Sequence, residues 1–313
     1  MFKKLTMSSF DRDLINAAKE GRVDEIRHLV GVNGANARAQ DVEKKTALIW
    51  AAQKGHLECV KALLPHSFAA KVDDDGSTAL HWAATKGHVD CVEFLATVID
   101  PNKKNHQGAT ALQEATAGAG DTRCVAFLAT ISDANNRDKH GRTALMIATN
   151  AGRFDCLSIL LPLSQASAVD QEGRHALIYA ANCSGHTPHN ARQQAPVLRC
   201  VEALMPLSDL DWKDGQGRTA FDVAAGLGQW ACMDLLATEA NRAIMDKVAK
   251  DLEGGFARHF PRWSARMEAE QLAKVAGLSV DGDPGLSGSA SPCAVEVGQA
   301  DSSSGSSRRK PRL

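Results

Sequence analysis

One stretch of the sequence carries residue types that could hold a metal ion. Cys183, His186 and His189 follow the spacing Cys-x2-His-x2-His, and Cys200 lies further along the chain. Thiolate and imidazole groups are ligands that zinc prefers, and three of them on one loop could coordinate it. No Cys-x2-Cys pair accompanies them, and the prolines of this stretch are typical of an extended loop. We therefore expect a solvent-exposed loop over 184–196 and keep a metal-dependent activity near Cys183–His189 as the alternative.

Most of the eight cysteines share a register that argues against chemistry. Six of them occupy one position of a repeated unit, 13 or 14 residues after a recurring triplet once the insertion in one unit is removed. Equivalent atoms of stacked helical units lie about 10 Å apart, whereas a disulfide needs Cα atoms within roughly 7 Å. We therefore expect thiols that pack as small apolar side chains, as suits a reducing compartment. These cysteines are Cys59, Cys91, Cys124, Cys156, Cys200 and Cys232.

The sequence carries no recognised signature of a catalytic site. It lacks a Gly-x4-Gly-Lys-Ser/Thr phosphate loop, a His-Glu-x2-His zinc motif, a Gly-x-Ser-x-Gly elbow and the motifs of protein kinases. Carboxylates such as those at 73–75 fall in expected turns open to water, where nothing prepares them for acid or base catalysis. We therefore predict that the protein is not an enzyme and needs no cofactor.

Composition and charge narrow the remaining classes. Of the 313 residues, 44% are hydrophobic and 23% are charged, as in an ordinary soluble protein. No apolar run reaches the roughly 18 residues that span a bilayer. Lys and Arg number 36 against 37 Asp and Glu, so the basic excess typical of nucleic-acid-binding proteins is missing. We expect neither a membrane nor a nucleic-acid partner. Because no apolar stretch follows the first lysines, we expect a cytoplasmic location.

A repeat organises most of the chain and must position any functional residue. The triplet Thr-Ala-Leu, or a close variant, begins at residues 46, 78, 110, 143, 175 and 219. A glycine precedes most triplets, and a small pair, a second glycine and an apolar stripe with helical spacing follow. The first glycine suits a turn with positive φ, the threonine an N-cap, and the second glycine a left-handed helix end. A period near 33 residues is typical of a helical solenoid.

The repeated unit resembles that of the ankyrin-repeat family. Asp75–Leu95, with the sequence DGSTALHWAATKGHVDCVEFL, matches an ankyrin repeat almost position for position, apart from Ala79 where the family often has proline. The resemblance covers Asp11–Ala237, and the residue pattern of the units is similar to that of ankyrin-repeat proteins of unicellular eukaryotes. It implies an all-α solenoid of about seven helix-turn-helix units with short β-turn connections. It also implies that His56 and His88 tie neighbouring loops together by hydrogen bonds.

The domain organisation follows the repeats. We expect an N-terminal extension over 1–10, a repeat domain over 11–237 and a helical C-terminal cap over 238–276. The first unit lacks the turn signature and is charged outside, as the end of a solenoid requires. The expected units are 11–40, 41–73, 74–105, 106–138, 139–170, 171–214 with the insertion 184–196, and 215–237.

The cap is expected to contain two helices, Glu239–Leu252 and Arg262–Ala276, separated by glycines and Pro261. Residues 277–313 are rich in Ser and Gly and are expected to be disordered. Their basic end, Arg308–Arg312, could be a nuclear-import signal, a tether to an anionic surface, a phosphorylation-sensitive segment or a merely solubilising end.

In the family that this chain resembles, the turn tips and the exposed side of the first helices usually hold a protein partner. One slot of these helices carries aromatic residues, which are enriched at binding hot spots. The sequence leaves open whether these rings contact a partner, pack between units, or both. The candidate binding residues on the first helices are Trp50, Trp82 and Tyr179, with Ile49, His81 and Met146 in the preceding slot.

Charged and aromatic residues of the turns complete the candidate surface. Asp74 is acidic, Lys104 and Arg137 are basic, and Trp212 is a further ring. Such a strip could set the orientation and association rate of a partner rather than its affinity. We predict a monomeric, non-enzymatic scaffold or adaptor for proteins of unknown identity. A regulatory or inhibitory subunit that occludes or targets an enzyme such as a kinase is the alternative.

Overall fold

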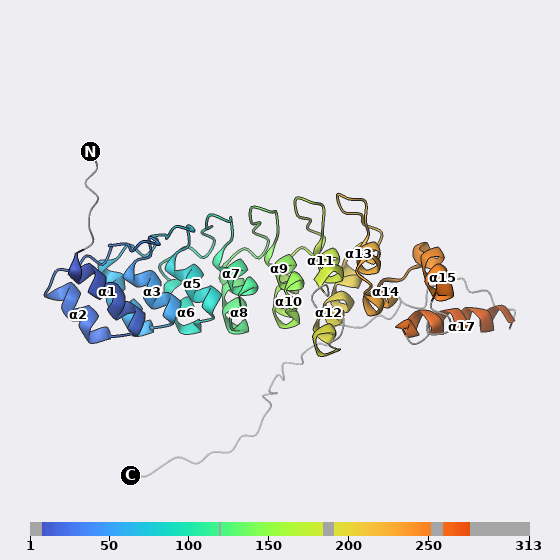
Figure 1. Cartoon of the computed structure of the whole chain (residues 1–313), viewed down its shortest axis with the longest axis horizontal. Coiled ribbons are helices and arrows are strands. Elements are labelled where there is room, and N and C mark those ends of the chain that lie inside the picture. The colour runs from blue at the N-terminus through green and yellow to red at the C-terminus, as the bar shows by residue number, and fades with distance from the viewer. Residues whose placement is uncertain (1–7, 119, 184–190, 252–258, 276–313) are drawn as a thin grey trace, which may run out of the picture. The chain divides into compact units, whose positions relative to one another are not determined.

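The repeats fold into successive pairs of helices, as the computed structural model shows for residues 8–118, 120–183, 191–251 and 259–275 (Figure 1). These residues contain helices and turns and no strand, so the predicted all-α solenoid is confirmed. The pairs are α1 (Ser9–Glu20) and α2 (Val23–Gly31), α3 (Ala47–Lys54) and α4 (Leu57–Leu63), α5 (Ala79–Lys86) and α6 (Val89–Leu95), α7 (Ala111–Ala117) and α8 (Thr122–Ile131), α9 (Ala144–Asn150) and α10 (Phe154–Leu160), α11 (Ala176–Cys183) and α12 (Ala191–Leu204), and α13 (Ala220–Gly226) and α14 (Trp230–Leu236).

The first helix of each pair contacts the first helix of the next, from α1 through α13, and the second helices contact in the same order, from α2 through α14. These helices have seven to 14 residues, and isolated helices shorter than about 12 residues are marginal in water. Packing between pairs therefore has to stabilise them. The alanine pairs at 51–52, 83–84 and 180–181 are fully buried and let neighbouring helices approach closely.

The recurring threonines and glycines act as the sequence predicts, except at the end of α7, where the C-cap Gly118 is extended with φ −73° instead of left-handed. Thr46 accepts a hydrogen bond from the backbone N–H of Ile49, which caps α3. Gly55 and Gly87 end α3 and α5 with φ of 79° and 76°, a region that glycine alone enters without cost. The leading glycines, from Gly76 to Gly217, also have positive φ. In the second unit Lys44 takes that position with φ 54°.

The six cysteines that share one register are all buried in the second helices. Cys59, Cys91, Cys124 and Cys156 carry free thiols, and burial raises the pKa of Cys91 and Cys124 to about 11. Their packing role is therefore confirmed.

The structure differs from the sequence-based expectation in three segments. Helix α1 begins at Ser9, which Ser8 caps, rather than near residue 11. Residues 191–196 were expected in an extended loop but belong to α12, which contains Pro196. Pro261 was expected to break a helix and instead begins α17 (Pro261–Val275), because proline fits the first turn of a helix.

The C-terminal cap begins with η5 (Glu239–Asn241) and α15 (Arg242–Asp251). Asp234 accepts hydrogen bonds from the backbone N–H groups of Arg262 (3.1 Å) and Trp263 (2.9 Å), which fixes the start of α17 against α14. The chain divides into two units, residues 1–265 and 266–313; of the second, the structure describes helical residues 266–275. The expected tail with Arg308–Arg312 lies outside the described residues. None of the helices described is both long and apolar enough to cross a bilayer.

Candidate protein-binding surface

Each first helix from α3 to α13 is preceded by a tight turn, here called a finger, that one side chain organises. The Oδ1 atom of that residue accepts hydrogen bonds from the backbone N–H groups two and four residues later. In the finger at 73–77, Asp73 receives them from Asp75 at 3.0 Å and from Ser77 at 2.8 Å. The organising residues are Asp41, Asp73, Asn105, Asp138, Asp170 and Asp214.

In three fingers the second carboxylate oxygen holds an aromatic ring nine residues later. The indole N–H of Trp50 donates to Asp41 at 2.7 Å, and that of Trp82 donates to Asp73 at 2.6 Å. The Tyr179 hydroxyl donates to Asp170 at 2.7 Å. The predicted aromatic slot is therefore one structural position, and its rings are fixed at the base of the fingers.

Trp50 and Trp82 belong to a row of alternating rings and cations. The Lys19 ammonium lies 4.1 Å from the Trp50 ring centroid, and the Lys45 ammonium lies 4.7 Å from Trp50 and 4.1 Å from Trp82. The Lys45 side chain is buried and also pairs with Glu43 at 2.8 Å. Both indoles are half-buried. We call Lys19, Trp50, Lys45 and Trp82 the ring–cation row.

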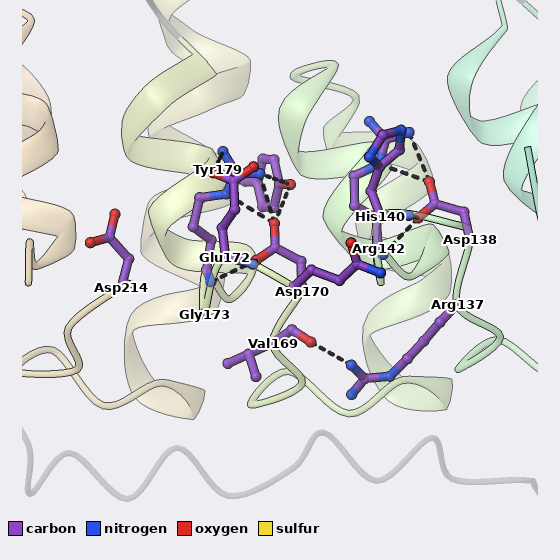
Figure 2. Close-up of polar contacts among 12 residues, drawn as sticks. Arg137, Asp138, His140, Arg142, Val169, Asp170, Glu172, Gly173, Tyr179 and Asp214 are labelled. Carbon is purple, nitrogen blue, oxygen red and sulfur yellow. Dashed lines mark hydrogen bonds and ion pairs between the residues drawn. The ribbon is translucent and has the colours of Figure 1, made fainter. Parts of the chain in front are cut away.

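The fingers are linked to one another by backbone hydrogen bonds at their tips. His106 donates to the carbonyl of Asp75 at 2.8 Å, and Lys139 donates to that of Gln107 at 2.9 Å. Figure 2 shows the next fingers, where the Arg142 guanidinium contacts Asp138 and Tyr179 contacts Asp170. The tips therefore form a continuous surface with a fixed order of side chains.

The predicted finger residues help to build this surface. The Asp74 carboxylate pairs with Lys44 at 2.6 Å, and the Lys104 ammonium donates to the Arg137 carbonyl at 2.8 Å. Arg137 donates to the carbonyl of Val169 (Figure 2), and the Trp212 indole donates to that of Gly173 at 2.8 Å. All four side chains remain exposed, so their predicted contact with a partner stays open.

The structure corrects the prediction for the slot before the rings. The side chains of Ile49, His81 and Met146 are only 1–2% exposed, so they face neighbouring units and not a partner. The His81 Nδ1 accepts a hydrogen bond from the backbone N–H of Thr78, and its Nε2 lies 3.2 Å from the carbonyl of Ala109 in the next unit. Tyr179 is likewise buried at 5% exposure, so it supports its finger rather than a partner.

The role expected for the histidines after the second glycine is confirmed. Nε2 of His56 lies 3.2 Å from the carbonyl oxygen of Lys19, and Nε2 of His88 lies 3.1 Å from that of Gln53. Each histidine therefore bonds to the preceding unit. Arg153 takes over this role further along, donating to two carbonyl groups in the last turn of α7 and to two in the loop that follows it.

The alternative metal site falls largely outside the described residues. His186 and His189 belong to 184–190, and the side chain of Cys183 is not described either. Among the residues that the structure does describe, no three metal-binding side chains converge. The alternative thus remains a sequence-based hypothesis.

Sequence reasoning missed the partners that hold the rings. The spacing of nine residues between an aspartate and an aromatic residue recurs at Asp41–Trp50, Asp73–Trp82 and Asp170–Tyr179, so the pattern was readable. The position of Lys45 between two indoles could not be predicted from the sequence, because the repeat does not conserve that residue type: the equivalent residue is Ser77 in the next unit and Arg174 in a later one.

Comparison with protein families agrees with the helix pairs, the fingers and the loop-tying histidines. A family model described as ankyrin repeats in three copies matches residues 14–105, 96–168 and 112–190, which together cover more than half of the chain. Repeats of this kind are protein–protein interaction modules. The chain belongs to the ankyrin-repeat family.

Proposed function

We propose that this protein is a non-enzymatic scaffold or adaptor that binds another protein through its first helices and fingers, centred on Trp50 and Trp82. The observation that supports this function most is the ring–cation row. It holds two half-buried indoles in fixed orientations on adjacent units, and rigid aromatic anchors lose little conformational entropy when a partner binds.

Charges at the neighbouring finger tips would orient the partner. Asp74 and Asp75 are exposed next to Trp82, whereas Lys104 and Arg137 are exposed on the following fingers. A partner with a basic segment opposite the third unit and an acidic segment beyond it would therefore dock in one direction. Exposed charges of this kind act more on association rate and orientation than on affinity.

The experiment compares proteins that co-purify with the wild type and with the double variant Trp50→Ala, Trp82→Ala. The double variant is expected to lose the partner while circular dichroism shows unchanged helical content. Phe68→Ala is the matched control, because Phe68 is an exposed ring that contacts Arg38 outside the ring–cation row. Equal recovery by the double variant would show that the assignment is wrong.

A second measurement distinguishes a passive scaffold from a regulator. If the captured partner is an enzyme, its activity is measured with and without the purified repeat protein. A scaffold leaves the activity unchanged, whereas a regulatory or inhibitory subunit changes it.

A further inference from the structure

The second helices present an apolar column on the side of the repeats away from the fingers. In each unit, the residue seven positions after the register cysteine lies at or just beyond the end of the second helix. Ile131 is the last residue of α8, Val98 follows α6, and Leu163 and Leu207 end the short 3-10 helices η2 (Leu161–Leu163) and η4 (Met205–Leu207). In four consecutive units this residue is a large apolar side chain that is 40–51% exposed. These residues are Val98, Ile131, Leu163 and Leu207.

Half-buried apolar residues widen this column. Phe94, Phe127 and Ile159 lie four residues before the exposed position and are half-buried. Phe127 and Ile131 share one face of α8, which contains both. Helices α6, α8, α10 and α12, which carry the column, contact one another in order and form a row (Figure 1). The column is bounded by polar residues, since the equivalent positions of the second and seventh units hold His66 and Glu239.

A row of alternating charges runs beside the apolar column. The residue just before the register cysteine is exposed in each of the same four units, and its charge alternates in sign along the row. The row consists of Asp90, Arg123, Asp155 and Arg199. A row with the signs minus, plus, minus, plus becomes its own complement when it is reversed.

We propose that this surface, formed by α6, α8, α10 and α12, binds a second copy of this chain in antiparallel orientation. The two-fold axis runs between α8 and α10, parallel to the helices. Arg123 then faces the partner's Asp155, and Asp90 faces the partner's Arg199. The same operation places Ile131 opposite the partner's Leu163, so the apolar and charged rows match together, as a two-fold interface requires.

Other registers match the charges less well. An axis passing through α8 or through α10 would place Arg123 or Asp155 opposite its own copy, and like charges facing each other are unfavourable. Of the other charges beside this row, Glu93 adds to the acidic third unit, and Glu202 is already paired with Arg262 at 2.7 Å. Arg123 is paired with Asp121 of its own unit at 2.7 Å, and the partner's Asp155 would add a second carboxylate to it. Charge therefore favours one arrangement of the dimer.

The area of this surface gives an estimate of how tightly the two copies bind. Four helices spaced about 10 Å apart and about 15 Å long offer roughly 600 Å² on each copy. The total of roughly 1,200 Å² lies at the lower end of specific interfaces, so we expect a dissociation constant on the order of micromolar. This dimer departs from the monomer that the sequence alone predicts, and it leaves the ring–cation row accessible.

Sedimentation velocity of the full chain tests the proposal. Between roughly 1 µM and 1 mM, the mass is expected to rise from 33.4 kDa toward twice that value. Ile131→Glu and Leu163→Glu are each expected to raise the dissociation constant at least about tenfold. Val42→Glu is the matched control, because Val42 is 95% exposed on a finger; it should dimerise like the wild type.

A charge swap makes the test independent of apolar burial. Arg123→Glu and Asp155→Arg should each weaken the dimer, and the double variant should restore it, because the two residues face each other across the axis. A wild type that stays monomeric over this range overturns the proposal, as does a dimer that Ile131→Glu leaves intact or a double swap that fails to restore association. If the protein instead binds phosphatidylserine vesicles as a monomer, and Ile131→Glu abolishes that binding, the proposed dimer is wrong and the apolar column binds a membrane surface.

Discussion

The indole N–H of Trp82 donates a hydrogen bond of 2.6 Å to the Asp73 carboxylate, the same group that shapes the finger before it. One side chain therefore fixes both the backbone turn and the orientation of the ring. Asp41 and Trp50 repeat this relationship in the preceding unit. Because the finger and the ring share a carboxylate, the geometry of the proposed binding surface depends on the repeat itself.

The same relationship predicts the effect of removing one hydroxyl group. Tyr179→Phe keeps the ring but deletes its hydrogen bond to Asp170, whose side chain is 1% exposed. Burial raises the pKa of Tyr179, and the bond to Asp170 raises it further, so the hydroxyl stays protonated and donates. Hydrogen bonds to charged groups contribute about 1.5–3 kcal/mol to stability. Because Asp170 keeps its ion pair with Arg174 in the variant, we expect the free energy of unfolding, measured in urea, to fall by about 1.5 kcal/mol. A loss below about 0.5 kcal/mol would contradict this role.

His81 predicts a dependence of stability on pH. Burial lowers the pKa of His81 below its ordinary value of 6.5, so below that pH the unfolded chain binds a proton that the folded protein does not. The free energy of unfolding therefore falls as the pH decreases through about 6.5. In His81→Gln the amide can make the bonds that Gln113 makes at the same position of the next unit.

Urea titrations at about pH 7 and about pH 5 check this prediction. The decrease in the free energy of unfolding should be smaller for His81→Gln than for the wild type. Some decrease should persist, because burial also lowers the pKa of His175. Equal decreases in the two proteins would assign the pH dependence to other groups.

The sequence predicts the backbone of this protein better than its surface. Periodic glycines and threonines specify turns and caps directly, so the helix pairs and the contacts of His56 and His88 could be anticipated. The burial of adjacent residues on a short helix is harder to predict. A rotation of about 100° per residue is all that separates the buried Ile49 from the half-buried Trp50. The interleaving of Lys45 between two rings depends on packing across units, which no local pattern encodes.

Lys44 offers a test of the finger geometry. It has φ 54°, where five later fingers have glycine, and this conformation is strained for a residue with a Cβ atom. Its ion pair with Asp74 is exposed, and such pairs contribute little. We therefore expect Lys44→Gly to raise the Tm by about 2–4 °C. A lower Tm in a calorimetric scan would show that the ion pair outweighs the strain.

The buried cysteines should resist alkylation in the native protein. Burial raises the pKa of Cys91 and Cys124 to about 11, so almost no thiolate is present near neutral pH. Mass spectrometry of peptides after iodoacetamide treatment should show these two residues unlabelled in buffer and labelled in urea. Equal labelling of Cys91 in both conditions would contradict its packing role.

The most direct test of the account is a binding titration of the co-purified partner against single variants. Trp82→Ala should raise the dissociation constant at least about tenfold, a loss of about 1.4 kcal/mol typical of a hot-spot ring, whereas Phe68→Ala should leave it unchanged. If Trp82→Ala binds the partner as tightly as the wild type, the first-helix surface is not where this protein binds.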